Sequence, residues 1–505
     1  MTNKSVTIIG AGIAGLSAGC YLQMNGYNTR IFEMSNIFGG LCASWSRKNY
    51  NINGGFHSLI GCQPDSDFYH IWKELGIIPK LKFVHFDNYI CFEAFNGKKV
   101  IMHSNLDKLE AHLLDVAPED HKLIEKFMNA ARKLVDCRIP TVLIAPELYG
   151  VRNGLKALSM IFPHIGLLRK WMKISMSEFA SCFKSTPLRE IFTSLWFPES
   201  PVLFFLFMLS MMQRKETGYP VGGPMEFAKA IERRYINLGG EIHYGSEVSE
   251  IIVKNDRATG IKFTDGSECH EGTIVSAADG YATVFKLLKG KYITRKIKQC
   301  YNKYPIFPPL ISMSFGLDRS FNLMNNVSSG INFPLEKHIV LAGEERLRLG
   351  IRTHDFDPTA APTGKTLARC LIPSNFPYWE PLMEDRTRYR EEKKYITEKV
   401  SAMLEKRFPG FGSHTDMCDT ATPLTYYDYT GNWQGSHQGW MLTSKTGTYR
   451  MKKTLPGLSN FYMIGQWVEP GGGVPLAAVS GRNIAQILCK RDKKSFITTE
   501  SEKME

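Results

Sequence analysis

A glycine-rich turn near the amino terminus constrains this chain more than any other feature. The apolar run at residues 6–9 leads directly into Gly10, Gly12 and Gly15, and a stretch with helical spacing follows. A second apolar strand then ends at Glu33, at the distance from the turn that a dinucleotide fingerprint requires. Strand, glycine turn, helix, strand and acid in this order predict a dinucleotide-binding βαβ unit.

Each glycine of the turn has a physical role in such a unit. Gly10 allows the sharp turn off the strand, Gly12 lets backbone approach a pyrophosphate, and Gly15 lets the helix pack closely on the strand. The pyrophosphate would lie at the helix N-terminus, where unpaired N–H groups and the helix dipole favour negative charge. Glu33 can accept hydrogen bonds from a ribose 2′-hydroxyl but would repel a 2′-phosphate, so we expect FAD or NAD and not NADP.

Further glycine pairs favour FAD over NAD. Gly39-Gly40 follows the second strand, and Gly54-Gly55 follows a short strand at residues 50–53. Glycine pairs let backbone pass close to a bound molecule. A cofactor that extends beyond the pyrophosphate requires this second pair, whereas an NAD-binding domain does not.

The bulk composition bounds the class of protein. The chain has 505 residues, a formal net charge of +13 and 43% hydrophobic residues, which fits two or three globular domains. The positive charge favours acidic partners, and because no basic run carries interleaved aromatic residues we expect a lipid surface and no nucleic acid.

The cysteines and the apolar runs bear on location. The 11 cysteines are scattered without a C-x-x-C motif, which favours buried thiols in a reducing compartment. No signal peptide is visible, and the longest apolar run, at residues 202–212, falls short of the ~20 residues that span a bilayer. We therefore expect a cytoplasmic protein, with peripheral attachment to a membrane.

The rest of the chain alternates between two kinds of segment. Residues 65–215 are predicted to be mainly helical, and residues 218–279 return to a nucleotide-binding pattern with a hairpin turn at Asp265-Gly266. Residues 290–450 form a second excursion before a final strand at residues 460–465 and a glycine-rich entry into a last helix. The charged residues 490–505 are predicted to be a disordered tail.

One helical segment has two interpretations that the sequence leaves open. Residues 145–180 combine apolar side chains with five interspersed cations. This pattern is typical of an interfacial amphipathic helix with its apolar face in a membrane. It is equally typical of a helix pair packed on the protein with a solvated basic face.

The carboxyl-terminal third carries a more specific pattern. Ala-Thr-Pro-Leu-Thr at residues 421–425 precedes Tyr-Thr-Gly-Asn at 429–432, and an Ile-Gly pair at 464–465 precedes Pro-Gly-Gly-Gly-Val-Pro at 470–475. Together with the amino-terminal fingerprint, these segments resemble the phytoene desaturase-like family of flavoproteins within the amine oxidase-like superfamily. That family contains carotenoid desaturases, carotenoid cis–trans isomerases and retinol saturases, and the resemblance covers almost the whole chain.

The resemblance implies an α/β fold with a Rossmann-like FAD-binding domain, of the two-dinucleotide-binding-domain type, assembled from discontinuous segments, and an inserted α+β substrate domain. The implied FAD-binding segments are residues 1–100, 215–290 and 455–489. The implied substrate-binding and membrane-facing segments are residues 101–214 and 291–454.

The resemblance also implies which residues hold a non-covalent FAD. The pyrophosphate would lie at the first glycine turn, the adenosine ribose at Glu33, and the isoalloxazine at the last helix entry. The implied contacts are Gly10, Gly12, Ile13, Ala14, Gly15, Glu33, Met34, Gly40, Leu41, Gly55, Phe56, His57, Val248, Ala277, Gly465, Gln466, Gly473, Val474 and Pro475. This chain departs from its relatives at Gln466, where an acid is usual, at Leu41, where a base is frequent, and at His57.

The implied function is hydride exchange at flavin N5 with a carbon–carbon bond of a hydrophobic polyene or isoprenoid lipid. Desaturation, saturation and cis–trans isomerisation all stay open. The alternatives are a soluble amine oxidase, a fatty-acid double-bond isomerase, and a non-catalytic carrier of a lipid cargo. His57 and Glu469 are the ionisable residues expected near the ring, without a catalytic assignment. No histidine or cysteine pattern indicates a metal.

Overall fold

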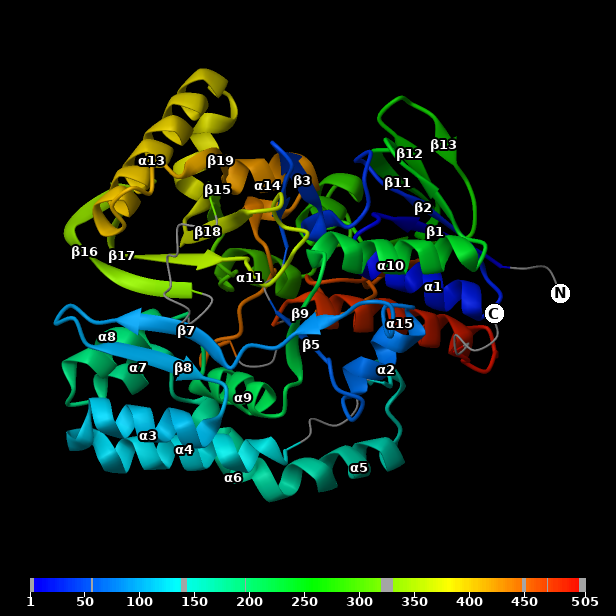
Figure 1. Cartoon of the computed structure of the whole chain (residues 1–505). Helices are drawn as coiled ribbons and strands as arrows, with labels where there is room; N and C mark the ends of the chain where they lie inside the picture. Colours follow the sequence, from blue (N-terminus) through cyan, green and yellow to red (C-terminus); the bar gives the residue numbers. More distant parts are fainter. Residues whose placement is uncertain are drawn as a thin grey trace.

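The structure is a computed structural model of the chain. It describes residues 4–55, 58–137, 143–195, 197–318, 330–446, 451–469 and 471–498. Figure 1 shows a parallel sheet with long helices on the right of the view, a larger sheet on the left with a long helix above it, and a row of helices along the lower edge.

Five strands form a parallel sheet in the order β10–β2–β1–β14–β20. Ile8 in the central strand pairs with Ile31 on one side and Val275 on the other. The strands come from both ends and the middle of the chain, which confirms the predicted Rossmann-like domain assembled from discontinuous segments. They are β1 (Ser5–Ile9), β2 (Asn28–Phe32), β10 (Glu241–His243), β14 (Thr273–Ser276) and β20 (Phe461–Met463).

Three helices pack together on one face of this sheet (Figure 1). They are α1 (Ile13–Met24), α10 (Gly223–Asn237) and α15 (Val474–Arg491). Glycines allow the close approach: a Cβ at Gly19 would lie 2.6 Å from the ring of Tyr235, and a Cβ at Gly481 would lie 2.5 Å from the amide nitrogen of Ala18. Helix α1 is therefore held tightly between α10 and α15.

A small antiparallel sheet covers the other face. It consists of β11 (Val248–Lys254), β12 (Arg257–Phe263) and β13 (Glu268–Cys269). Ile251 and Ile261 share a buried cluster with Ile9, Phe32 and Ile274 of the parallel sheet. The predicted hairpin turn is present, since the amide of Ser267 donates to the Asp265 carboxylate at 2.9 Å between β12 and β13. Helix α11 (Arg295–Lys303) packs beside this layer.

A second, mixed sheet has the order β19–β15–β18–β17–β16–β7–β8. Its first two strands in the sequence lie in the stretch predicted to be mainly helical, and β7 joins the sheet by pairing with β16, more than 200 residues away. Helix α13 (Arg386–Arg407) covers the sheet through Ile396, Val400 and Leu404. The strands are β7 (Asn88–Glu93), β8 (Lys99–His103), β15 (Leu310–Asp318), β16 (Gly330–Leu341), β17 (Glu344–Thr353), β18 (Lys365–Pro373) and β19 (Thr415–Ala421).

The remaining helices of the first half form a lobe along the lower edge of Figure 1. Its core is aromatic, with Phe127 packed against Phe179, Phe192 and Phe205. The longest apolar run of the sequence is buried here as α9, as part of that core. The helices are α3 (Leu106–Val116), α4 (His121–Val135), α5 (Val151–Ile161), α6 (Ile165–Met172), α7 (Met176–Ser181), α8 (Thr186–Ser194) and α9 (Val202–Gln213).

Short elements connect the three parts. β9 pairs with both β5 and β6, and β3 pairs with β4 in a hairpin. The connecting elements are α2 (Asp67–Glu74), α12 (Phe376–Trp379), α14 (Pro423–Thr430), β3 (Ser44–Arg47), β4 (Tyr50–Asn53), β5 (Leu59–Ile60), β6 (Phe83–Val84) and β9 (Thr217–Pro220).

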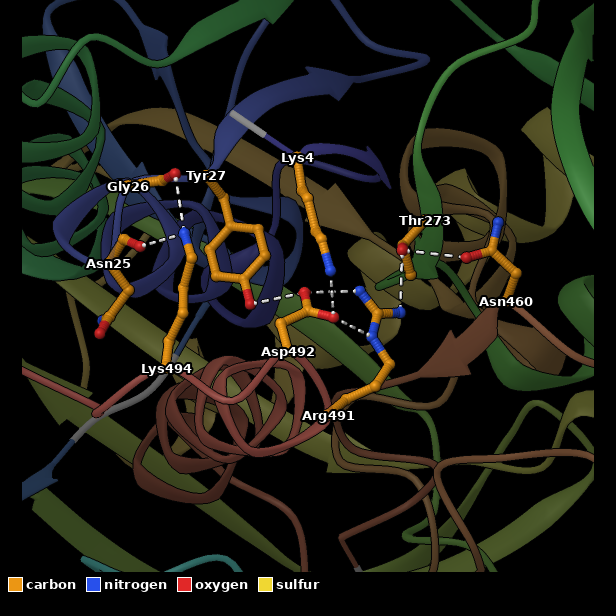
Figure 2. A network of polar contacts seen from close by, with 9 residues as sticks. All are labelled: Lys4, Asn25, Gly26, Tyr27, Thr273, Asn460, Arg491, Asp492 and Lys494. Carbon is orange, nitrogen blue, oxygen red and sulfur yellow. Dashed lines mark hydrogen bonds and ion pairs between the residues drawn. The ribbon is translucent and has the colours of Figure 1, made fainter. Parts of the chain in front are cut away.

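The end of the chain differs from the predicted disordered tail. Residues 490–498 lie against the amino-terminal unit, while residues 499–505 are outside the described part. The Asp492 carboxylate accepts hydrogen bonds from Lys4 Nζ at 2.8 Å and from the Tyr27 hydroxyl at 2.9 Å, and the Lys494 ammonium donates to the backbone of α1's carboxyl end (Figure 2). In the described part of this segment, Arg491, Asp492 and Lys494 have polar partners in the folded chain.

Candidate functional site

The turn between β1 and α1 has the backbone that its glycines predict. Gly10 adopts a φ of +98°, and a Cβ at Gly15 would lie only 2.0 Å from the Gly10 carbonyl oxygen. Gly12 precedes α1 with an ordinary φ of −70°, and no atom of the described chain lies within 4 Å of where its Cβ would be. Gly15 is thus required by the fold, whereas the fold has room for a Cβ at Gly12.

The first turn of α1 lacks the groups that usually neutralise a helix N-terminus. Helix α1, all of which is described, has no acidic residue in its first turn and no side chain hydrogen-bonded as a cap. The first N–H groups of a helix have no intrahelical acceptor, and the helix dipole adds partial positive charge there. The amides of Ile13, Ala14 and Gly15 therefore form a site that suits a phosphate.

Glu33 ends β2 beside this turn and is 8% exposed. Its carboxylate accepts hydrogen bonds from the Ala11 amide at 2.7 Å and from the Ser35 amide at 2.9 Å. Burial raises the pKa of Glu33 above its usual value, and the backbone hydrogen bonds oppose that shift. Because each carboxylate oxygen has a second lone pair, Glu33 can also accept ribose hydroxyls. Met34, the next residue, is exposed and faces Gly431.

The second glycine pair lies directly against the first turn. The Gly39 amide donates to the Ala11 carbonyl at 2.9 Å, and Gly39 forms a parallel bridge with Gly12. A Cβ at Gly40 would lie 3.4 Å from the Gly12 Cα. Leu41 follows in a 3₁₀ turn.

Part of the third predicted glycine turn also reaches this place. A Cβ at Gly55 would lie 3.1 Å from the Leu41 carbonyl oxygen. The predictions for Phe56 and His57 fall outside the described residues.

Two predicted residues flank the turn from other strands. Ala277 follows β14, and its amide donates to the Ile9 carbonyl at 2.9 Å. Val248 begins β11 and packs in the same apolar cluster as Phe32. Since ligands of open parallel sheets bind outside the carboxyl ends of the strands, both residues lie on the expected side.

The carboxyl-terminal turn reaches the same place, and the converging turns after β1, β2 and β20 are together called the groove below. Gly465 follows β20 with a φ of +98°, and a Cβ there would lie 3.5 Å from the Cβ of Ala14. The Gly465 amide donates to the Ser480 hydroxyl at 3.0 Å, and the Gln466 side chain donates to Asn432 at 2.9 Å. The neutral Gln466 is therefore held in place by a partner that the sequence did not reveal.

Gly473, Val474 and Pro475 form the entry of α15. Gly473 has a φ of +87°, and Val474 and Pro475 are the first residues of the helix. Like α1, the described α15 carries no acid in its first turn and no side-chain cap. Two uncapped helix N-termini thus serve one groove, with Ala14 of α1 beside the strand end that leads to α15.

The sequence matches the family of flavin containing amine oxidoreductases over residues 13–489. The chain belongs to this family. It is 25% identical over 495 residues to prolycopene isomerase 2, chloroplastic, of an Oncidium hybrid cultivar, covering 94% of this chain and 82% of that one. It is 23% identical over 513 residues to the neurosporene-forming phytoene desaturase of Rhodobacter capsulatus, covering 95% and 93%. Among solved structures, an oxidoreductase from Methanosarcina mazei aligns with a TM-score of 0.57 at 18% identity, over 95% of this chain and all of the other.

The groove of this flavin-dependent oxidoreductase fits a flavin nucleotide by its own geometry. The N-termini of α1 and α15 carry no acid and no side-chain cap, which suits a phosphate, and Glu33 has acceptor capacity for a hydroxyl group. Across the described residues, no helix combines the length and the apolarity needed to cross a membrane. The same part of the chain contains no group of three or more His, Cys, Asp or Glu side chains suited to a metal ion.

A buried ion pair lies close to the entry of α15. Lys453 Nζ lies 2.7 Å from a Glu469 carboxylate oxygen, and both side chains are 1% exposed. Lys453 also lies 2.9 Å from Glu147. The sequence singled out Glu469 but gave no signal for Lys453, because the two residues meet through loops and not through a motif.

Asp279 is a second buried carboxyl, and it lies beside the loop that contains Trp433. Asp279 accepts hydrogen bonds from the amides of Ala282 at 2.8 Å and Trp433 at 3.0 Å. Burial raises the pKa of Asp279 to about 6, against the lowering effect of these amides. The residue therefore anchors the Trp433 loop while its own proton is held more tightly than usual.

Arg369 is a buried cation that the sequence analysis missed. It donates to the Ser312 hydroxyl at 2.8 Å, and its Nε and Nη1 atoms have no hydrogen-bond acceptor among the described residues. Burial lowers the pKa of Arg369. Its place in β18, a strand with a run of buried residues, was the signal that could have marked it.

Proposed function

We propose that this protein binds one FAD non-covalently along the groove. The uncapped first turn of α1 supports the pyrophosphate position, and the hydrogen-bonded Glu33 supports the adenosine ribose position. The isoalloxazine would lie at the entry of α15, where helix N–H groups stabilise negative charge near N1 and O2 of a reduced flavin. The other proposed contacts are Met34, Gly40, Leu41, Gly55, Phe56, His57, Val248, Ala277, Gly465, Gln466, Gly473, Val474 and Pro475.

We propose a hydrophobic polyene or isoprenoid as the substrate. The observation that carries this proposal is the match to carotenoid-related proteins over 94–95% of this chain, which includes both the groove and the remaining lobes. A bound flavin would supply hydride exchange at N5 with a carbon–carbon bond. We propose that residues 1–100, 215–290 and 455–489 hold the cofactor, and that residues 101–214 and 291–454 hold the substrate.

We further propose that the protein lies on the cytoplasmic surface of a membrane. An apolar polyene resides in lipid, and α5 and the 3₁₀ turn after it offer apolar side chains to the outside: Val151 of α5 and Phe162 of the turn are 82% and 68% exposed. The 11 cysteines are all free, which fits a reducing compartment.

The first experiment is the visible spectrum of the purified protein, with analysis of the nucleotide released on denaturation. We expect a yellow protein that releases FAD. A colourless protein without releasable flavin would end the proposal, and flavin that stays with the denatured chain would overturn its non-covalent part.

The second experiment gives the purified protein cis-configured and saturated polyenes and separates the products by chromatography with mass spectrometry. Loss or gain of two hydrogens would identify a desaturase or saturase, and equal mass with altered retention would identify an isomerase. Turnover of amines with peroxide release, and no reaction with any polyene, would contradict the proposed substrate.

A further inference from the structure

Helix α5, the 3₁₀ turn after it and the first residue of α6 expose an apolar stripe to solvent; it is called the α5 stripe below. Five large apolar residues repeat at intervals of four and three, which places them on one side of the helical path. Amphipathic helices normally bury such a stripe. Here the helix α5 itself buries no residue. The stripe consists of Val151, Leu155, Leu158, Phe162 and Ile165, with exposed fractions of 82%, 61%, 53%, 68% and 39%.

This exposed helix is nevertheless firmly mounted. The segment that leads into it is attached to α15, because the Ala145 amide donates to the Gln486 side chain at 2.7 Å and Gln486 donates to the Leu143 carbonyl at 2.8 Å. Glu147 in the same segment pairs with Lys453 at 2.9 Å. The chain is therefore anchored to α15 and to Lys453 just before α5 begins.

A basic groove lies between α4 and α6, and in Figure 1 these two helices and α5 follow one another along the same edge of the molecule. The groove has a volume of about 570 Å³. Four lysines and a single glutamate line it, together with the ring of Trp171. The lysines are Lys122, Lys126 and Lys133 of α4 and Lys170 of α6.

The four lysines outnumber the single acid that lines the groove, Glu125. Among the described residues none of the four forms an ion pair within 4.0 Å. Lys170 Nζ lies 5.3 Å from the centre of the Trp171 ring. Partial burial and then the nearby charge of Lys126 lower the pKa of Lys170, as expected for ammonium groups facing each other across a small space. Such a cluster attracts an anion.

We propose that this groove binds the phosphate headgroup of an anionic phospholipid while the α5 stripe inserts among the acyl chains of the same membrane. This proposal rests on the peripheral membrane attachment proposed above and names its lipid. A free anion would need only the groove, but the groove lies next to an outward apolar stripe with flanking cations, Arg152 and Lys156. One shallow apolar insertion binds weakly and reversibly, and a second, electrostatic contact is what makes attachment stable.

The test is flotation of the full-length protein with vesicles of phosphatidylcholine, with and without phosphatidylglycerol. We expect at least tenfold tighter binding when phosphatidylglycerol is present, and loss of this increment at high salt because counter-ions screen it. In the variant Lys126→Gln/Lys170→Gln, binding to phosphatidylcholine should be unchanged and the anionic increment should fall at least tenfold. The matched control, Lys394→Gln/Lys399→Gln, removes the same charge from exposed positions on α13 and should keep the increment.

A second variant, Leu155→Ser/Phe162→Ser, tests the stripe. Both side chains are exposed, so the flavin spectrum should match the wild type, while binding to both kinds of vesicle should fall. Wild-type protein that binds no vesicle would overturn the membrane attachment itself. If the Lys126→Gln/Lys170→Gln variant still bound more tightly in the presence of phosphatidylglycerol, as the wild type does, the headgroup site alone would be overturned. Binding of inorganic phosphate to the groove in solution, by a protein whose vesicle binding shows no anionic increment, would identify a free-phosphate site and contradict the lipid.

Discussion

The flavin groove and the outer face of α5 are built in opposite ways. In the groove, glycines remove side chains so that backbone can lie against backbone, as where Gly39 meets Gly12. On α5 no residue is buried, and the surface is formed by exposed side chains. A site made of backbone tolerates almost no substitution at its close contacts, whereas a surface made of side chains tolerates many, each with a small effect. Five changes test this difference.

The largest effect should come from Gly15→Ala. The added Cβ would lie 2.0 Å from a backbone oxygen that cannot move without displacing β1. The cost should exceed the about 1–3 kcal/mol usual for an overpacked side chain. We expect insoluble or unfolded protein, checked by expression and circular dichroism. A folded Gly15→Ala protein with normal flavin content would show that the turn is less tightly built than described.

Next is Lys453→Met, which tests the connection between the two regions. Lys453 joins Glu147, which precedes α5, to Glu469, which precedes α15. The variant removes the ion-pair partner of the buried Glu469 carboxylate, and breaking a buried pair in this way costs about 3–5 kcal/mol. Chemical denaturation should show this loss, and the double variant Lys453→Met/Glu469→Leu should recover much of it. Equal losses in the single and double variants would mean that the charge of Glu469 is compensated elsewhere.

The third prediction concerns Asp279 and the dependence of folding stability on pH. The proton on Asp279 stabilises the folded state, because burial raises its pKa from the usual 3.8 to about 6. That stability is complete below the usual pKa and is lost as pH rises through about 6, in total about 3 kcal/mol at 1.36 kcal/mol per pKa unit. The Asp279→Asn variant should lack this part of the pH dependence when unfolding is followed across that range. Superimposable pH profiles would contradict the assignment to Asp279.

The effect of Gly12→Ala on folding should be milder than that of the preceding changes, because the fold has room for the new methyl group. The protein without flavin should keep its melting temperature, yet its affinity for FAD should fall at least tenfold, or about 1.4 kcal/mol. Flavin titration followed by fluorescence quenching measures this. Unchanged affinity would mean that the space beside Gly12 is not where the pyrophosphate lies.

The smallest effect belongs to Gly154→Ala, which has equally free space on α5. Alanine is about 1 kcal/mol better than glycine in a helix interior. Because α5 is exposed, the gain should appear as roughly fivefold slower amide exchange within α5, with flavin binding unchanged. Gly12 and Gly154 both have room for a Cβ, but only the substitution at Gly12 should change the affinity for FAD.

These differences also explain what the sequence could predict. The positions of Gly10 and Gly15 were predictable because only glycine permits the φ of +98° at Gly10 and the close backbone contact at Gly15, so the residue type itself reports the geometry. The direction of the α5 stripe was not predictable, because an amphipathic helix has the same sequence whether its apolar side faces the core or the solvent. The pairing of Lys453 with Glu469 brings two loops together and leaves no periodic pattern.

Two further differences follow from long-range contacts. Strands β7 and β8 lie in a stretch that was predicted to be mainly helical, since β7 finds its partner β16 far along the chain. Residues 490–498 have the composition of a disordered tail, but Asp492 is held by Lys4 and Tyr27 at the other end of the chain. In both cases the deciding partner is remote, and local composition carries no information about it.

The scattered origin of the parallel sheet has a consequence for how the protein is made. Its first two strands are complete by Phe32, but the outer strand β20 begins only at Phe461. At about 5–20 residues per second, a ribosome needs on the order of tens of seconds to deliver that last strand. Four of the five strands have been made by Ser276, but the outer edge of β14 stays unpaired until β20 is synthesised. The parallel sheet can therefore be completed only after more than nine-tenths of the chain has left the ribosome.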